Sequence, residues 1–194
     1  MTVFLRRSVL AVGLVALGLG GCSNTQGPAA ASTTKGAERA SLAQNSRTAL
    51  DALYATRPGA RELADKAHAV LVFPSITKAG LGIGGLYGSG TMFEKGREVG
   101  FYNIAGGTFG LQIGAQSFSQ AYFFNSKEAL ETFRKTKGFE IGAGATAVAA
   151  DFGADGSISS STLQKPVVVA SWGQSGLMAG VDIQGAKITE INPS

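Results

Sequence analysis

Few side chains in this sequence have a type and spacing suited to chemistry. The 194 residues include one histidine, His68, and one cysteine, Cys22, and they contain neither a G-x-S-x-G nor an H-E-x-x-H motif. A single histidine cannot build a histidine-rich metal site. His68 stands where a predicted helix meets a predicted strand, which is typical of a surface or helix-end residue rather than a general base. The sequence therefore predicts neither a nucleophilic centre nor a histidine-based metal centre.

Three aspartates are the remaining candidates for acid–base chemistry or calcium binding. They are Asp151, Asp155 and Asp182. Asp155 precedes Gly156, and this pair is favoured in turns because of its backbone preferences. We therefore predict a protein that is not an enzyme and that uses no cofactor or metal ion.

Basic residues are the better candidates for binding a ligand. One group surrounds a predicted hairpin turn and the glycines before it, and a second group stands near the end of a predicted helix. The residues are Lys78, Lys95, Arg97, Arg134, Lys135 and Lys137. Either group could face phosphates, although cations at a helix C-terminus are favoured by the helix dipole whatever the function. Each basic residue near an anionic membrane adds about 1 kcal/mol, so we predict weak contacts with lipid headgroups.

The beginning of the chain resembles the signal peptide of a bacterial lipoprotein. Two arginines, Arg6 and Arg7, precede an apolar run at 8–19 that is short for a membrane-spanning helix. The Leu-Gly-Gly-Cys sequence at 19–22 then resembles a lipobox. A lone cysteine is otherwise often an inert buried thiol, but this position favours acylation, for example with palmitate, of Cys22.

We therefore predict a signal peptide at 1–21 and a lipid anchor at Cys22, which leaves no free thiol for disulfides. Ser23 follows the cysteine, and this favours the periplasmic face of the outer membrane, while the inner membrane and the cell surface stay open. Residues 22–37 are rich in Ser, Thr, Ala, Gly and Pro, which predicts a flexible tether. Residues 38–194 are predicted to form one folded domain.

The charge of the chain argues against a nucleic-acid partner. The formal net charge is +4, and it falls to +2 without Arg6 and Arg7, with 15 basic against 13 acidic residues. This excess is too small for the electrostatic footprint of a nucleic-acid-binding protein.

Two helices are predicted at the start of the folded domain. Apolar residues recur at helical spacing between Glu38 and Tyr54, and a second helix is predicted to begin at Pro58. Acidic residues interrupt the arginines on both, so packing on a sheet is favoured over a location on the membrane surface. A third helix is predicted after Asn125 as N-cap, with Glu128 in a capping box and Gly138 at its end.

The remaining segments favour β-structure. Ala69–Pro74 is a short apolar run, Lys95–Gly96 marks a hairpin turn, and residues 108–116 alternate between apolar and polar or small side chains. Further strands are predicted at 141–149, in "VVVASW" and in "LMAGVDIQGAKITEI". We therefore predict an α+β fold that is mainly antiparallel β. It is expected to be a small curved sandwich or partly closed barrel of about seven or more short strands, with N-terminal helices and one inserted helix.

The stretch "KAGLGIGGLYGSG" permits three explanations for its glycines. Gly80, Gly82 and Gly85 satisfy G-x-G-x-x-G, but no helix follows to receive a pyrophosphate. Gly84 and Gly88 form a G-x-x-x-G pair, but the apolar stretch around them is far shorter than the roughly 20 residues that span a bilayer. The favoured explanation is a bent sheet, in which glycine permits bulges and close backbone approach.

Four segments in order resemble the SYLF domain, a lipid-binding module that also occurs in bacterial lipoproteins. They are "VLVFPSITKAGLGIGGLYGSG", "GTFGLQIGAQSFSQAYFF", "GAGATAVAAD" and "SGLMAGVDIQG", within residues 60–191. The resemblance implies phospholipid binding, with phosphoinositide preference in some eukaryotic members and actin contact in a yeast branch. Eukaryotic members often carry basic residues before the glycine that matches Gly176, whereas this chain has Gly173, Gln174 and Ser175.

The function expected from these observations is that of a membrane-anchored lipoprotein whose periplasmic domain binds phospholipid without converting it. The alternative is an envelope structural or adaptor protein that binds another protein through a face of its sheet. Its partner is unknown in that case. The sequence predicts a phospholipid membrane as partner in the first case and no nucleic acid in either.

Overall fold

The chain folds as an α+β protein built around one curved sheet, as the sequence predicts. A computed structural model describes residues 28–136, 147–173 and 186–191. The helices are α1 (Pro28–Thr56), α2 (Pro58–Lys66), α3 (Lys127–Lys135) and α4 (Ser160–Leu163). The strands are β1 (Ala69–Glu94), β2 (Arg97–Phe124), β3 (Ala147–Ala149), β4 (Val167–Trp172) and β5 (Ala186–Glu190).

The sheet consists mainly of two long antiparallel strands. Its order is β1-β2-β4-β3, with β5 also paired to β2, and only the β3–β4 pair is parallel. Several segments that the sequence predicts as separate short strands are continuous in β1 and β2, because pairing persists through the glycines. Three register shifts, the second of them between Leu81 and Gly82, let these long strands bend.

The predicted hairpin turn is confirmed between β1 and β2. Lys95 and Gly96 both have positive φ angles, 47° and 77°, as a two-residue type I′ turn requires. Glycine adopts this conformation freely, and the right-handed twist of the strands favours the turn.

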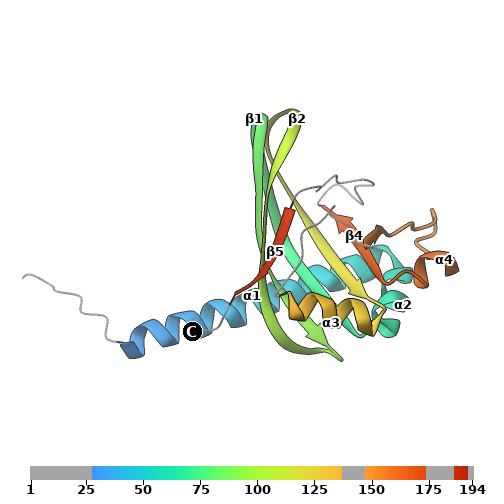
Figure 1. Ribbon diagram of the computed structural model, residues 1–194, viewed down its shortest axis with the longest axis horizontal. Coiled ribbons are helices and arrows are strands. Elements are labelled where there is room, and N and C mark those ends of the chain that lie inside the picture. Colours follow the sequence, from blue (N-terminus) through green and yellow to red (C-terminus); the bar gives the residue numbers. More distant parts are fainter. Residues whose placement is uncertain (1–27, 137–146, 174–185, 192–194) are drawn as a thin grey trace, which may run out of the picture.

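The β1–β2 ribbon folds back so that the two halves of β1 face each other. A Cβ atom on Gly90 would lie 2.5 Å from the carbonyl oxygen of Val72, and one on Gly88 would lie 2.8 Å from that of Ser75. Figure 1 shows the paired strands rising past the helices and turning back. The favoured explanation for the glycine cluster, a bent sheet with close backbone approach, is therefore confirmed at these positions.

The start of β1 is buried on both faces, which explains its unbroken apolar run. Leu71 and Phe73 belong to a core formed with α3 and β5, whereas Val70 and Val72 belong to a second core. The second core lies under α1 and α2 and includes Leu53, Leu63 and Trp172. Both helices therefore pack on the sheet, as the sequence predicts.

The described helices depart from the predicted bounds at two places. α1 begins at Pro28, so residues 28–37, which were predicted to be part of a flexible tether, are helical. Proline is favoured in the first turn of a helix, and the alanines that follow have the highest helix propensity. The N-cap of α3 is Ser126 rather than Asn125, because the amide of Asn125 instead donates to the carbonyl oxygens of Leu163 and Lys165.

Replacing Ser126 by alanine is expected to lower the free energy of unfolding by about 1 kcal/mol, the usual cost of losing an N-cap. The Ser126 hydroxyl oxygen accepts a hydrogen bond from the backbone N–H of Ala129 at 3.3 Å and donates to Glu128. Urea unfolding measures the change. Ser160→Ala is the control, because the exposed Ser160 hydroxyl makes no hydrogen bond to a described residue, and equal losses in both variants would contradict the assigned cap.

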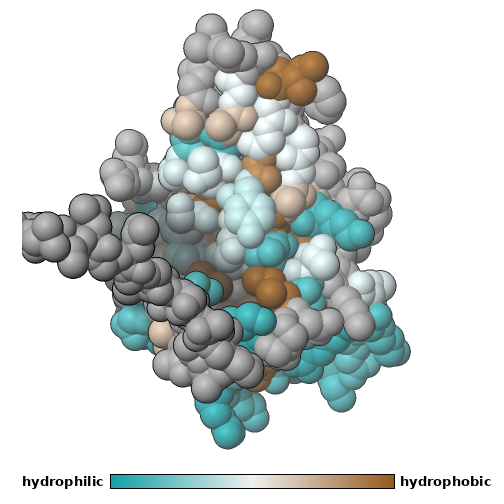
Figure 2. All heavy atoms as spheres, turned by 90° about the vertical axis from the view of Figure 1, so that its left-hand side faces the viewer, coloured by the Kyte–Doolittle hydropathy of each residue, from teal (hydrophilic) through white to brown (hydrophobic). Residues whose placement is uncertain are grey.

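The upper part of the ribbon carries no charged residue. Residues 79–93 and 99–126 contain no Asp, Glu, Lys or Arg. Among the described side chains of this ribbon, three large apolar ones are nevertheless open to solvent: Ile83 at 73%, Tyr87 at 56% and Val99 at 47% exposure. Figure 2 shows the same separation, with hydrophilic residues gathered at the opposite end of the molecule.

Candidate functional site

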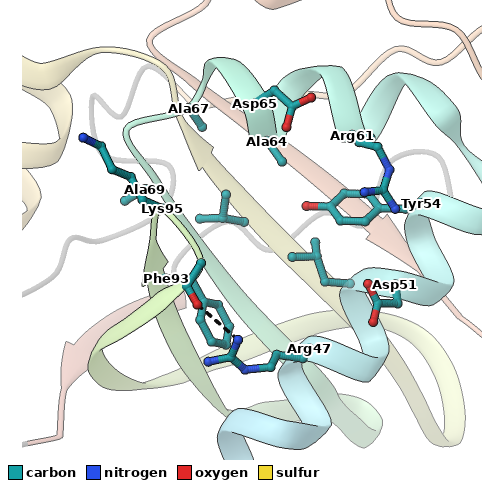
Figure 3. A pocket seen from close by; sticks show the side chains of 13 residues that line it. Arg47, Asp51, Tyr54, Arg61, Ala64, Asp65, Ala67, Ala69, Phe93 and Lys95 are labelled. Carbon is teal, nitrogen blue, oxygen red and sulfur yellow. Dashed lines mark hydrogen bonds between the residues drawn. The ribbon is translucent and has the colours of Figure 1, made fainter.

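Basic side chains from three elements meet near the β1–β2 turn. Arg134, at the end of α3, forms an ion pair with Glu94, the last residue of β1. Arg47 of α1 donates a hydrogen bond to the carbonyl oxygen of Gly96 over 3.1 Å, drawn as a dashed line in Figure 3. The two contacts hold one end of the sheet against both helices, and we call the five basic residues there the basic end. They are Arg47, Lys95, Arg97, Arg134 and Lys135.

The structure brings together four of the six basic residues that the sequence singled out. Lys95 lies in the turn and Arg97 follows it, and both are exposed. Lys135 follows the ion-paired Arg134 on α3 and is also exposed. Lys78 lies elsewhere, in the middle of β1 opposite Gln116. Two further predictions, Lys137 and the lipidation site Cys22, lie outside the described residues.

A cleft of about 490 Å³ opens beside the basic end, between α1, α2 and the β1–β2 turn. Five of its lining residues carry charge at neutral pH, and Figure 3 shows them around the opening. They are Arg47, Asp51, Arg61, Asp65 and Lys95. Arg47 and Arg61 are not recognisable from the sequence, because both stand in helices with mixed charge and only the tertiary fold places them at the cleft.

Aromatic rings hold both of these arginines. The guanidinium carbon of Arg47 lies 4.8 Å from the centre of the Phe93 ring, and that of Arg61 lies 4.6 Å from the centre of the Tyr54 ring. A guanidinium group is attracted electrostatically to an aromatic face, so both arginines are positioned without a carboxylate partner from the described part of the chain. None of the five charged residues of the cleft forms an ion pair with another described residue.

Tyr54 presents a hydroxyl group to the cleft. Figure 3 shows its ring between Asp51 and Arg61, with the oxygen directed toward the open space. Burial raises the pKa of Tyr54 to about 12, with Asp65 and Asp51 adding to the rise and Arg61 opposing it. The hydroxyl is therefore protonated at neutral pH and makes no hydrogen bond to any described residue, so it is free to donate to a ligand.

Removing this hydroxyl is expected to change how stability depends on alkaline pH. The pKa of Tyr54 is about 12 in the folded state and about 10, the ordinary value, in the unfolded state. The resulting contribution to stability is fully present below pH 10 and is lost as the pH rises toward 12. Tyr54→Phe should therefore match the wild type in urea unfolding at about pH 9 and lose less stability than the wild type at about pH 11. Parallel loss in the two proteins would show that Tyr54 titrates normally.

Some of the residues that the sequence weighed for catalysis can be placed in the structure. His68 is exposed between α2 and β1. Asp155 accepts hydrogen bonds from the hydroxyl and the backbone N–H of Ser157, at 2.7 and 3.0 Å, and these lower its pKa. Asp182 lies outside the described residues, and among those described no group of three or more His, Cys, Asp or Glu side chains is placed to hold a metal ion.

The described helices also include none with the length and apolar character needed to cross a bilayer. α1 is long, but polar and charged residues occur along it.

One family model matches the second half of the chain. Residues 105–193 match the family model Ysc84, described as Las17-binding protein actin regulator. The match contains three of the four segments on which the SYLF resemblance rests and begins after the first, which lies in β1. A comparison with curated proteins gave no match. Residues 105–193, slightly less than half of the chain, are therefore similar to the Ysc84 family, in agreement with the SYLF resemblance of the sequence.

Proposed function

We propose that this protein binds phospholipid headgroups without converting them, and that the basic end is the surface that contacts the membrane. The observation that carries the proposal is the convergence of Arg47, Lys95 and Arg97 with the end of α3 at one place. The helix α1, the β1–β2 turn and the end of α3 are distant in sequence, so the fold gathers these residues. A helix dipole accounts for cations at the end of α3 but not for those on α1 and the turn.

The electrostatic attraction is modest and suits an anchored protein. Each basic residue near an anionic surface adds about 1 kcal/mol, and Arg134 adds less because Glu94 already neutralises it. Lipidation of Cys22, on the periplasmic face of the outer membrane, is part of this proposal. An anchor keeps the domain beside the bilayer at high effective concentration, so weak headgroup contacts are sufficient. Actin is not included, because the lipobox-like sequence favours an envelope location.

Vesicle flotation tests the proposal. Residues 25–194 contain every described element but not Cys22, so any association reports on the domain itself. We expect flotation with vesicles that contain anionic phospholipid at low salt and a loss of flotation as salt is raised, because salt screens exposed charges. Failure to associate with any bilayer at low salt would remove the proposal.

Lipidation needs its own test, with the full chain in a bacterial host. Metabolic labelling with a palmitate analogue should mark the wild type and leave Cys22→Ala unlabelled. Equal labelling of the two, or none in either, would contradict the anchor at Cys22.

A protein-binding function is the second candidate, and the exposed ribbon favours it. Ile83 and Tyr87 are solvent-exposed on an uncharged part of β1. β1 has a partner strand on one side only among the described strands, so its other edge could pair with a strand from another chain. A photo-crosslinker at position 87 in intact cells should capture one dominant protein if this function is correct, whereas scattered products would count against it.

A further inference from the structure

We propose that the cleft beside the basic end selects a phosphate ester that carries a primary ammonium group, as in the phosphoethanolamine headgroup of a phospholipid. This inference rests on the proposed function and names the headgroup that the cleft prefers. Its basis is the presence around one opening of charges of both signs, none of which forms an ion pair with a described residue.

Three side chains of the cleft can donate hydrogen bonds to the phosphate group of such a ligand. Arg47 is fixed by its contacts with Phe93 and Gly96, and it retains further N–H groups that can donate to a phosphate oxygen. Lys95 lies at the rim on the same turn and is exposed. The protonated hydroxyl of Tyr54 has no described partner and can supply a third hydrogen bond. Charge-assisted hydrogen bonds of this kind are the stronger ones in proteins.

Two carboxylates of the protein line the cleft and can bind the ammonium group. Asp51 follows Arg47 by one turn of α1, and Asp65 stands near the end of α2. Both influence the pKa of Tyr54, which places them near the same ring. Neither carboxylate forms an ion pair with a described residue. In a cleft that bound only an anion, these two negative charges would repel the ligand. An ammonium group would offset them.

The aromatic rings argue for a primary ammonium over a quaternary one. Quaternary ammonium groups have no N–H and are recognised mainly by aromatic faces. Here Phe93 and Tyr54 already carry guanidinium groups at 4.8 and 4.6 Å from their ring centres. The aromatic faces are thus occupied, and the carboxylate oxygens remain to bind the ammonium group. They suit a primary ammonium, which donates hydrogen bonds.

The size and walls of the cleft also fit a headgroup. Its volume of about 490 Å³ lies within the roughly 300–1,000 Å³ that is usual for small-molecule sites. Its remaining walls include Leu50, Ala64 and Ala67, which are partly buried and offer an apolar surface to the glycerol part of a lipid.

Native mass spectrometry of the full-length protein in detergent tests this selection by direct competition. The protein is incubated with equal amounts of phosphatidylethanolamine, phosphatidylcholine and phosphatidylglycerol that differ in acyl mass. We expect the ethanolamine lipid to be enriched about tenfold over each of the others, the effect of one additional charge-assisted hydrogen bond. Enrichment below twofold would overturn the inference, and because this result needs no variant it does not depend on a mutant's folding.

A charge-matched pair of variants locates the selection in the cleft. Asp51→Asn/Asp65→Asn should abolish the preference for ethanolamine while the total amount of bound lipid is kept. Glu38→Gln/Glu62→Gln makes the same change in charge on the same helices, outside the cleft, and should retain the preference. Equal preference in both double variants would overturn the assignment to the cleft.

The outcomes of this experiment distinguish headgroup selection from the proposed function and from the binding of a soluble ligand. Binding of all three lipids without preference would overturn the headgroup selection and leave the proposed function standing, whereas the absence of any bound lipid would overturn both. Free O-phosphoethanolamine is added as a last arm. If it displaces the lipid at equal concentration, the ligand is a soluble aminophosphate and the lipid assignment is overturned.

Discussion

Gly90→Ala is expected to destabilise the fold by about 3 kcal/mol or more, at the upper end of the effects of overpacking. The new Cβ atom would lie 2.5 Å from the carbonyl oxygen of Val72 and 2.7 Å from Cδ1 of Phe73. The carbonyl is backbone and Phe73 is fully buried, so neither can move aside without separating the two halves of β1. Urea unfolding of residues 25–194 would measure the loss.

Gly107→Ala is the matched control on the neighbouring strand. A Cβ atom there meets no atom within 4 Å, and its φ is not positive. We expect a change within about 0.5 kcal/mol, as for most surface substitutions. If Gly90→Ala proved as stable as Gly107→Ala, the close approach between the halves of β1 would be wrong.

Neutralising the basic end is expected to weaken association with anionic vesicles about 100-fold. Lys95→Gln/Arg97→Gln/Lys135→Gln removes three exposed charges that make no ion pair with a described residue. At about 1 kcal/mol for each charge, the total of about 3 kcal/mol corresponds to about two powers of ten in the partition coefficient. Vesicle flotation at low salt measures this coefficient.

The control removes the same charge from elsewhere on the surface. Lys127, Lys165 and Lys187 are exposed and lie outside the basic end. Their triple Gln variant should bind within about threefold of the wild type, because exposed charges farther than about 10 Å from the membrane are screened at ordinary salt. If both triple variants lost binding equally, net charge rather than the basic end would explain the attraction.

Local patterns in the sequence were sufficient to predict much of the fold. The Lys95–Gly96 turn, the third helix with buried Leu130 and Phe133, and the strand at Val167–Trp172 are confirmed. Each depends on turn chemistry or periodicity within a few residues. The continuity of β1 through its glycines was not predictable in this way, because a glycine cluster has the same appearance in a loop as in a strand paired along its whole length.

The candidate site could be predicted only in part. Lys95 and Arg97 were identified because they border a recognisable turn. Arg47 was missed because its importance comes from Phe93 and Gly96, which are far away in the sequence and adjacent only after folding. The ion pair between Arg134 and Glu94, which joins the two predicted groups of cations, is equally long-range.

Depth-dependent fluorescence quenching tests most directly which end of the molecule meets the membrane. Residues 25–194 contain no cysteine, so Glu98→Cys at the basic end and Tyr87→Cys on the ribbon can each carry a single fluorophore. With vesicles that contain a brominated anionic phospholipid, the account predicts quenching of the probe at position 98 and none at position 87. Quenching at position 87 alone, or at neither position, would contradict membrane binding through the basic end.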